Sequence, residues 1–246
     1  MKFLEASGRY FILMSKVFAK PEKYRLYYYQ FMREVEKIGI NSFGIVVIIS
    51  LFVGAVITLQ TNYNLENPLL PVYLIGVTVR DSLLLEFSST MVALILAGKV
   101  GSSIASEIGT MRTTEQIDAL EIMGVNSASY LILPKIIAGV FFFPILSLLS
   151  MFVGIFGGYL LCVLTEVIPP SDYIYGIQYA FYPHYISYAL VKTVFYAFII
   201  VTISAFQGYY AYGGALEVGR SSTKAVVYSS ILLLLANLIL TKLILS

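Results

Sequence analysis

The sequence predicts an all-α integral membrane protein with five transmembrane helices. We expect an amphipathic helix at the inner membrane interface before the first span and a short cytosolic helix between the second and third spans. Of 246 residues, 59% are hydrophobic and only 12% are charged, whereas about a quarter are charged in an average soluble domain. Long apolar stretches recur along the chain, and lysine and arginine gather in alternate loops, as in membrane proteins with several spans.

Five apolar stretches approach or exceed the length of a transmembrane helix, about 20 residues. They are Phe43–Gln60, Leu69–Ala97, Ile136–Val163, Tyr185–Phe206 and Ala225–Leu245. The third holds 28 residues without a charge. A hairpin of two half-spans is the alternative for this stretch, but two full crossings need about 40 residues. We therefore predict one long, tilted helix.

Basic residues predict the orientation of these helices, because cytosolic loops carry an excess of lysine and arginine. Residues 1–42 contain eight of them, residues 98–135 contain three and residues 207–224 contain two. The opposite side has only Arg80 and Lys242. We expect the N-terminus and the loop between the second and third spans to be cytosolic and the C-terminus to lie outside. We expect no cleavable signal sequence.

The first 40 residues are expected to form an amphipathic region ahead of a five-span domain over residues 41–246. Apolar side chains recur there at the spacing of one helix face: Tyr24, Tyr28, Phe31, Val35 and Ile38. Charged residues occupy the rest of the turn: Arg25, Arg33, Glu36 and Lys37. This pattern predicts a helix lying in the inner interface; the alternative is a cytosolic helix packed on the spans. Pro21 separates it from a similar stretch, Phe3–Phe18.

The polar segment after the second span contains a second amphipathic helix. Thr113 and Gln116 have the spacing of a capping box, which predicts a helix that begins at Thr114. Gly124 is placed to end it. Its apolar side chains share one side: Ile117, Leu120 and Met123. Its acidic side chains share the other: Glu115, Asp118 and Glu121. A basic groove on a partner protein would attract this acidic face; the alternative is a solvated connector.

Glu86 lies within the second span, where a charged group costs about 2.5–3.5 kcal/mol on insertion scales. It is therefore expected to face a cavity or a partner. Small or polar residues form a stripe with it at helical spacing: Ser82, Glu86, Ser89, Thr90, Ala93 and Ala97. Such a stripe suits the wall of a wet cavity or a close seam between two copies of the chain. Lys192, in the fourth span, is expected either to snorkel or to pair with an acid such as Glu86.

Several function classes are disfavoured by the residues present. The chain has no GxxxxGK[ST] sequence, so ATP hydrolysis would require a partner. One histidine and one cysteine, with scattered acids, supply no catalytic cluster for a lipid enzyme and no metal site. A formal charge of +2 is too small to argue for nucleic acid. An ion-coupled carrier that works alone is the alternative function, but it would favour paired membrane acids or repeated halves.

The run Ala97–Lys135 contains EIGTMRTTEQIDALEIMGV. It resembles the signature of the MlaE-type permease family, whose members are membrane subunits of ATP-driven lipid transporters. A second block resembles the family's second cytosolic signature: Gly213, Gly214, Gly219 and Arg220. The chain departs from the family pattern in having Lys99 for an arginine and Leu216-Glu217 in the second block. Glu86 is kept, but the preceding arginine and the following Gly-Pro of the family are missing.

The resemblance implies a permease in the bacterial inner membrane that pairs with a second copy of itself and with a cytosolic ABC ATPase dimer. ATP and Mg²⁺ would bind to the ATPase, and this chain would bind no cofactor. A periplasmic MCE-domain protein would continue a phospholipid route that maintains outer-membrane lipid asymmetry, and some systems add a STAS-domain protein. The ATPase-coupling residues would be Thr113, Thr114, Glu115, Gln116, Ile117, Asp118, Ala119, Leu120, Glu121, Met123 and Gly124. The lipid path would include Ser82, Glu86, Ser89, Thr90 and Ala93.

Overall fold

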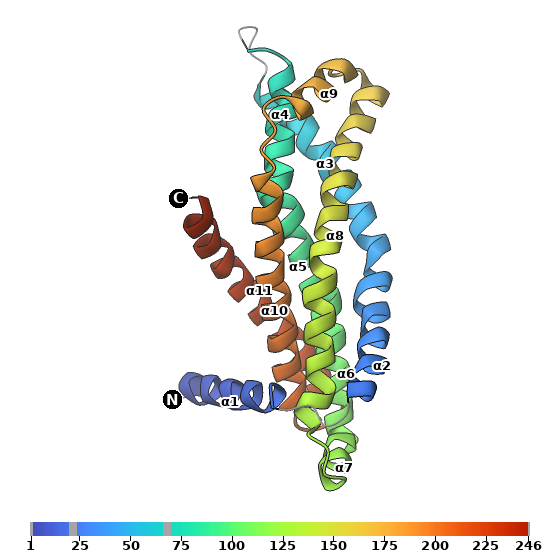
Figure 1. The fold of residues 1–246 in the computed structure, drawn as a ribbon, viewed down its shortest axis with the longest axis vertical. Helices are drawn as coiled ribbons and strands as arrows, with labels where there is room; N and C mark the ends of the chain where they lie inside the picture. Colours follow the sequence, from blue (N-terminus) through green and yellow to red (C-terminus); the bar gives the residue numbers. More distant parts are fainter. Residues whose placement is uncertain (1, 20–23, 66–69, 246) are drawn as a thin grey trace.

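The computed structural model describes residues 2–19, 24–65 and 70–245, and its regular structure is helical throughout these ranges (Figure 1). The elements, in which η marks π-helix, are α1 (Lys2–Val17), α2 (Tyr24–Glu34), η1 (Val35–Ile40), α3 (Asn41–Asn64), α4 (Tyr73–Ser82), η2 (Leu83–Met91), α5 (Val92–Leu96), η3 (Ala97–Gly101), α6 (Ser102–Thr113), α7 (Gln116–Ile122), α8 (Ser127–Thr165), α9 (Pro170–Gln178), α10 (His184–Tyr209) and α11 (Ala215–Leu245).

Five helices in the described ranges are long and apolar enough to cross a membrane, which confirms the predicted number of spans. They are Tyr27–Asn64, Tyr73–Thr113, Ser127–Thr165, His184–Tyr209 and Ala215–Ile244. The third span is one helix of 39 residues rather than a hairpin. It begins at Ser127 because Asn126 caps it, accepting a hydrogen bond from the backbone N–H of Ser129 at 3.2 Å. The predicted start of the second span, Leu69, lies outside the described residues.

Residues 24–38 do not form a helix separate from the first span, and their place in the membrane interface stays a prediction. α2, η1 and α3 follow one another without a break and stand along the bundle, whereas α1 projects sideways from its lower part (Figure 1). This segment is held upright by a buried contact, because Glu34 pairs with Lys135 of α8 at 2.7 Å. Ile38, one helical turn after Glu34, is also buried. α2 also packs on α8, and the expected boundary at residues 40 and 41 falls inside the continuous run from α2 to α3. Pro21 lies outside the described residues.

Glycines allow the first and third spans to touch through their backbones. A Cβ atom at Gly54 of α3 would overlap the carbonyl oxygen of Gly154 of α8, and one at Gly157 would overlap the carbonyl oxygen of Leu51. Nearby, the hydroxyl of Ser50 donates a hydrogen bond to that of Ser150 at 2.8 Å. Small residues at such crossings let helices pack closely in lipid, where no hydrophobic force drives them together.

The second span is longer and less regular than the sequence predicts. It continues past Ala97 to Thr113, because Ile104 and Ile108 of α6 are buried in the core. The predicted capping box is therefore wrong: the Thr113 hydroxyl bonds back to the carbonyl of Thr110 at 3.1 Å. The π-helical segments η2 and η3 also lie within this span. π-helical turns are rare and frequently occur at functional sites.

Candidate functional site

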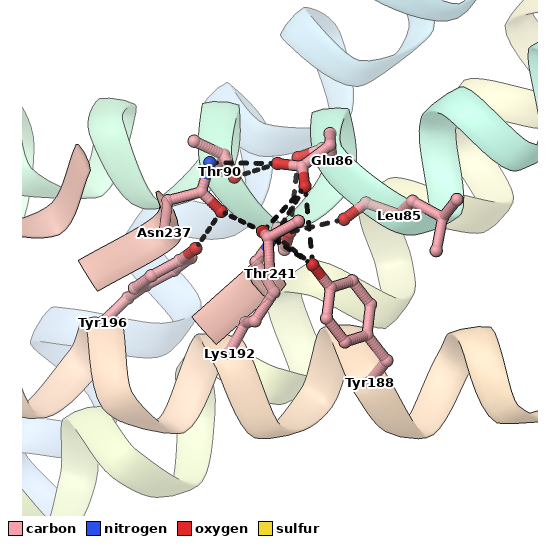
Figure 2. A network of polar contacts seen from close by, with 9 residues as sticks. Leu85, Glu86, Thr90, Tyr188, Lys192, Tyr196, Asn237 and Thr241 are labelled. Carbon is pink, nitrogen blue, oxygen red and sulfur yellow. Dashed lines mark hydrogen bonds and ion pairs between the residues drawn. The ribbon is translucent and has the colours of Figure 1, made fainter. Parts of the chain in front are cut away.

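Glu86 lies in η2 and faces α10 and α11, where it joins a network of polar side chains (Figure 2). One carboxylate oxygen, Oε1, accepts a hydrogen bond from Lys192 of α10 at 2.9 Å and from Thr241 of α11 at 3.2 Å. The other, Oε2, accepts from Asn237 of α11 at 3.1 Å and from Thr90 at 3.2 Å. The network thus joins the second, fourth and fifth spans.

Lys192 is fully buried, and its ammonium group has several acceptors besides Glu86. Its Nζ lies 3.0 Å from the hydroxyl oxygen of Tyr188 and 3.3 Å from the carbonyl oxygen of Leu85. The expected pairing with Glu86 is confirmed, and the snorkelling alternative is wrong. The carboxylate of Glu86 is the accessible partner, because its side chain is 39% exposed and that of Lys192 is 0% exposed. A buried ammonium needs such a partner, since an isolated charge in a low-dielectric interior is unfavourable.

Only part of the predicted stripe belongs to this network. Glu86 and Thr90 do, whereas Ser89 is buried and donates to the carbonyl oxygen of Glu86 at 3.2 Å. Ala93 is buried in the main core and Ser82 is half-buried. The stripe assumed 3.6 residues per turn, which does not hold through η2.

Sequence reasoning missed the contributions of α11 to the network. The side-chain oxygen of Asn237 accepts a hydrogen bond from Tyr196 at 2.7 Å, and Thr241 lies one helical turn further along. A signal existed: two polar residues four positions apart in an otherwise apolar span share one face. The arrangement holds the Glu86 carboxylate in place with hydroxyl, amide and ammonium donors. These polar groups can form hydrogen bonds with a polar ligand.

The predicted cytosolic helix exists as α7, but its bounds and its exposed face differ from the prediction. It begins at Gln116, after Glu115 adopts a left-handed backbone with φ of 59°. Ile117 is fully buried, as expected of the apolar side. Met123 follows the helix and is 68% exposed, and Ile122, which the prediction omitted, is 88% exposed. The projecting end of α7 is therefore apolar.

Two of the three predicted acidic residues on α7 hold the helix in place. Asp118 forms an ion pair with Arg112 of α6 at 2.6 Å. Glu121 accepts hydrogen bonds from Ser127 of α8 at 2.8 Å and from Tyr209 of α10 at 3.0 Å. These hydroxyl donors, Ser127 first, hold the pKa of the Glu121 carboxyl below its usual range against a smaller opposing effect of burial. α7 is thus tied to three neighbouring helices.

The other members of the predicted coupling segment line the turn and the flank of α7. Gln116 donates a hydrogen bond to the hydroxyl of Thr114 at 3.0 Å, and Thr114 donates to the carbonyl of Thr110 at 2.8 Å. Leu120 packs partly buried against the core, while Ala119 is exposed. Gly124 has φ of 76°, a backbone conformation that favours glycine and ends the segment as predicted.

The second predicted signature forms the turn from α10 into α11. Gly213 has φ of 119°, and the carbonyl of Gly214 accepts a hydrogen bond from the backbone N–H of Glu217 at 3.0 Å. Arg220 pairs with Glu217 on the exposed first turns of α11, and Gly219 is exposed beside them. The glycines therefore shape the turn, and the acid of this block is held by its own helix.

Five helices long and apolar enough to cross a membrane, three of them joined by a polar network around an ion pair, define an integral membrane protein. A model of the Permease MlaE family matches residues 31–243. The chain belongs to the MlaE permease family, and family members are the non-catalytic membrane subunits of ABC transporters.

Three relatives illustrate the range of this family. A probable ABC transporter permease protein of Rickettsia prowazekii is 35% identical, over 99% of this chain and 93% of the relative. The intermembrane phospholipid transport system permease protein MlaE of Haemophilus influenzae is 31% identical, over 97% and 92%. The chloroplastic protein TRIGALACTOSYLDIACYLGLYCEROL 1 of Arabidopsis thaliana is 30% identical, over 94% of this chain and 65% of the relative.

Proposed function

We propose that this chain is the permease subunit of an ATP-driven phospholipid transporter in a bacterial inner membrane. The observation that carries the proposal is the partly exposed Glu86 carboxylate, held by Lys192 between the second and fourth spans of a family member. Similarity to a protein named for intermembrane phospholipid transport supports the choice of substrate. The excess of basic residues supports a cytosolic N-terminus and a periplasmic C-terminus.

The proposed assembly contains two copies of this chain and two cytosolic ABC ATPase subunits, which bind ATP and Mg²⁺. A periplasmic MCE-domain protein receives or delivers the lipid, with outer-membrane lipid asymmetry as the result, and a STAS-domain protein joins in some systems. α1 is the interfacial helix of this arrangement: it projects sideways from the lower part of the bundle, buries Leu13 and Val17, and exposes Phe11 (Figure 1).

A photo-crosslinking residue at position 86 is expected to capture phospholipid, because the Glu86 side chain is accessible. The same residue at position 147 is expected to capture none, since Ser147 is fully buried against the backbone of η2. Glu86→Ala is expected to lower ATP-driven phospholipid transport in proteoliposomes roughly tenfold. Normal transport without an adduct at position 86 would remove Glu86 from the lipid path. Transport by this chain without any ATPase would favour the alternative, an ion-coupled carrier.

α7 is the proposed coupling helix, and its exposed apolar end is the proposed contact with the ATPase. Ile122→Asp is expected to reduce co-purification of the ATPase roughly tenfold, because a charge would be buried in an apolar contact. Glu115→Gln is the matched control, since Glu115 is exposed and forms no ion pair within the described part of the chain. If Glu115→Gln lost the ATPase while Ile122→Asp still bound it, the contact would instead be assigned to the acidic face of α7.

A further inference from the structure

An open cleft separates α2 and η1 from α6 near the base of the bundle, with α7 and α8 forming its remaining walls. Its volume is about 860 Å³, and a smaller hollow of about 50 Å³ adjoins it, sharing Glu34, Lys37, Ser103 and Glu107. The larger cleft falls within the range of small-ligand sites, roughly 300–1,000 Å³. The cleft belongs to a different part of the molecule from Glu86, which lies in η2 and does not line it.

Charged side chains line this cleft with an excess of positive charge. Glu107 of α6 accepts hydrogen bonds from Lys37 at 2.7 Å and from Lys135 at 2.9 Å, and Lys135 also pairs with Glu34. Arg33 is exposed at the cleft and forms no ion pair within the described ranges. Lys99 lines the adjoining hollow. With both hollows taken together, four basic side chains face two acidic ones.

The height of the cleft on the bundle matches a membrane surface. α1 projects sideways from the bundle at the level of α2 (Figure 1). On α2, next to Arg33, the side chains of Tyr28, Tyr29 and Met32 are exposed. Tyrosine favours the boundary between lipid and water. The cleft therefore opens where lipid headgroups would lie if α1 rests in the interface.

We propose that this cleft binds the phosphate of an anionic phospholipid from the cytosolic leaflet, with Arg33 and Lys37 as its principal partners. Basic pockets between transmembrane helices on the cytosolic side bind the headgroups of anionic lipids. The hydroxyls of Ser106 and Thr110 on the α6 wall offer hydrogen bonds to a glycerol headgroup. The assignment of the lipid to the cytosolic leaflet depends on the orientation given in the proposed function. The negative charge of the ligand is inferred from the residues of the cleft alone.

The test is native mass spectrometry of the purified chain, without the ATPase, after incubation with equal amounts of phosphatidylglycerol and phosphatidylethanolamine. Wild type is expected to retain phosphatidylglycerol preferentially. Arg33→Gln is expected to lower that retention about fivefold, and Arg33→Gln with Lys37→Gln more than tenfold. Arg33 is exposed and forms no internal ion pair within the described ranges, so its replacement is expected to leave the fold intact. Lys224→Gln, an exposed cation on α11 away from the cleft, is the control and is expected to change nothing.

Equal retention of the two lipids by wild type, or no effect of Arg33→Gln, would overturn the proposal. Displacement of the lipid by equimolar glycerol phosphate would assign the site to a soluble anion. Loss of ATPase binding in Arg33→Gln, with lipid retention unchanged, would assign the cleft to an acidic segment of the ATPase. Because no transport is measured, a failure here leaves the proposed function standing, and a failure of transport leaves the lipid site standing.

Discussion

Glu86→Gln is expected to destabilise the protein by about 3 kcal/mol, more than the removal of its partner. The reason is the unequal burial of the pair. Without Glu86, the fully buried ammonium of Lys192 retains only neutral acceptors such as Tyr188. Without Lys192, the partly exposed carboxylate keeps donors from Asn237 and other side chains and can reach a polar environment. Lys192→Met is therefore expected to have about half the effect.

The double variant Glu86→Gln with Lys192→Met tests this asymmetry. It is expected to be more stable than Glu86→Gln alone, because no uncompensated charge remains buried. The free energy of unfolding in detergent micelles, measured for all four proteins, gives the coupling energy of the pair. Single effects of equal size would contradict the unequal burial of the two groups. Effects that add in the double variant would contradict their mutual dependence.

Gly54→Ala is expected to destabilise the protein by about 3 kcal/mol or more, because the added methyl group would meet backbone rather than a movable side chain. The carbonyl oxygen of Gly154 occupies that position, so α3 and α8 would have to separate. Gly44→Ala, on the same helix, is the matched control. No atom lies within 4 Å of a Cβ at Gly44, and alanine in a helix interior is favoured over glycine by about 1 kcal/mol.

The measurement is again the free energy of unfolding in micelles, with helix content by circular dichroism as a check on folding. Should Gly54→Ala prove too unstable to purify, Gly157→Ala provides a second variant at the same crossing, against the carbonyl oxygen of Leu51. Equal stability of Gly44→Ala and Gly54→Ala would show that the two helices do not touch at this crossing.

The transmembrane helices could be predicted because apolar length alone determines them, as in the uncharged stretch that became α8. Their ends could not. α6 continues the second span because Ile104 and Ile108 find a buried environment, which depends on α10 and α11 rather than on the local sequence. For the same reason, the interfacial pattern of residues 24–38 did not reveal that Glu34 would find Lys135 more than a hundred positions away.

The candidate site was predictable through its charges and not through its neutral members. A carboxylate and an ammonium in separate apolar spans need partners, so the pairing of Glu86 with Lys192 could be expected. Asn237 and Thr241 are neutral, so the sequence does not require them to have a partner. The π-helical turns of η2 cannot be recognised from the spacing of apolar residues. Likewise, the amphipathic pattern of α7 placed Ile117 inside correctly, but the end of the helix at Ile122 turned Met123 outward.

The length of α8 has a mechanical consequence. At 39 residues it extends about 58 Å, farther than the thickness of a bilayer, as one rod. Its first residue, Ser127, is bonded to Glu121 of α7, and its far half is pressed against α3 through Gly154. A tilt of about 5° at one end displaces the other by about 5 Å over this length. Pro134 and Pro144 remove backbone hydrogen-bond donors within α8, so any bending of the helix is concentrated at these two prolines.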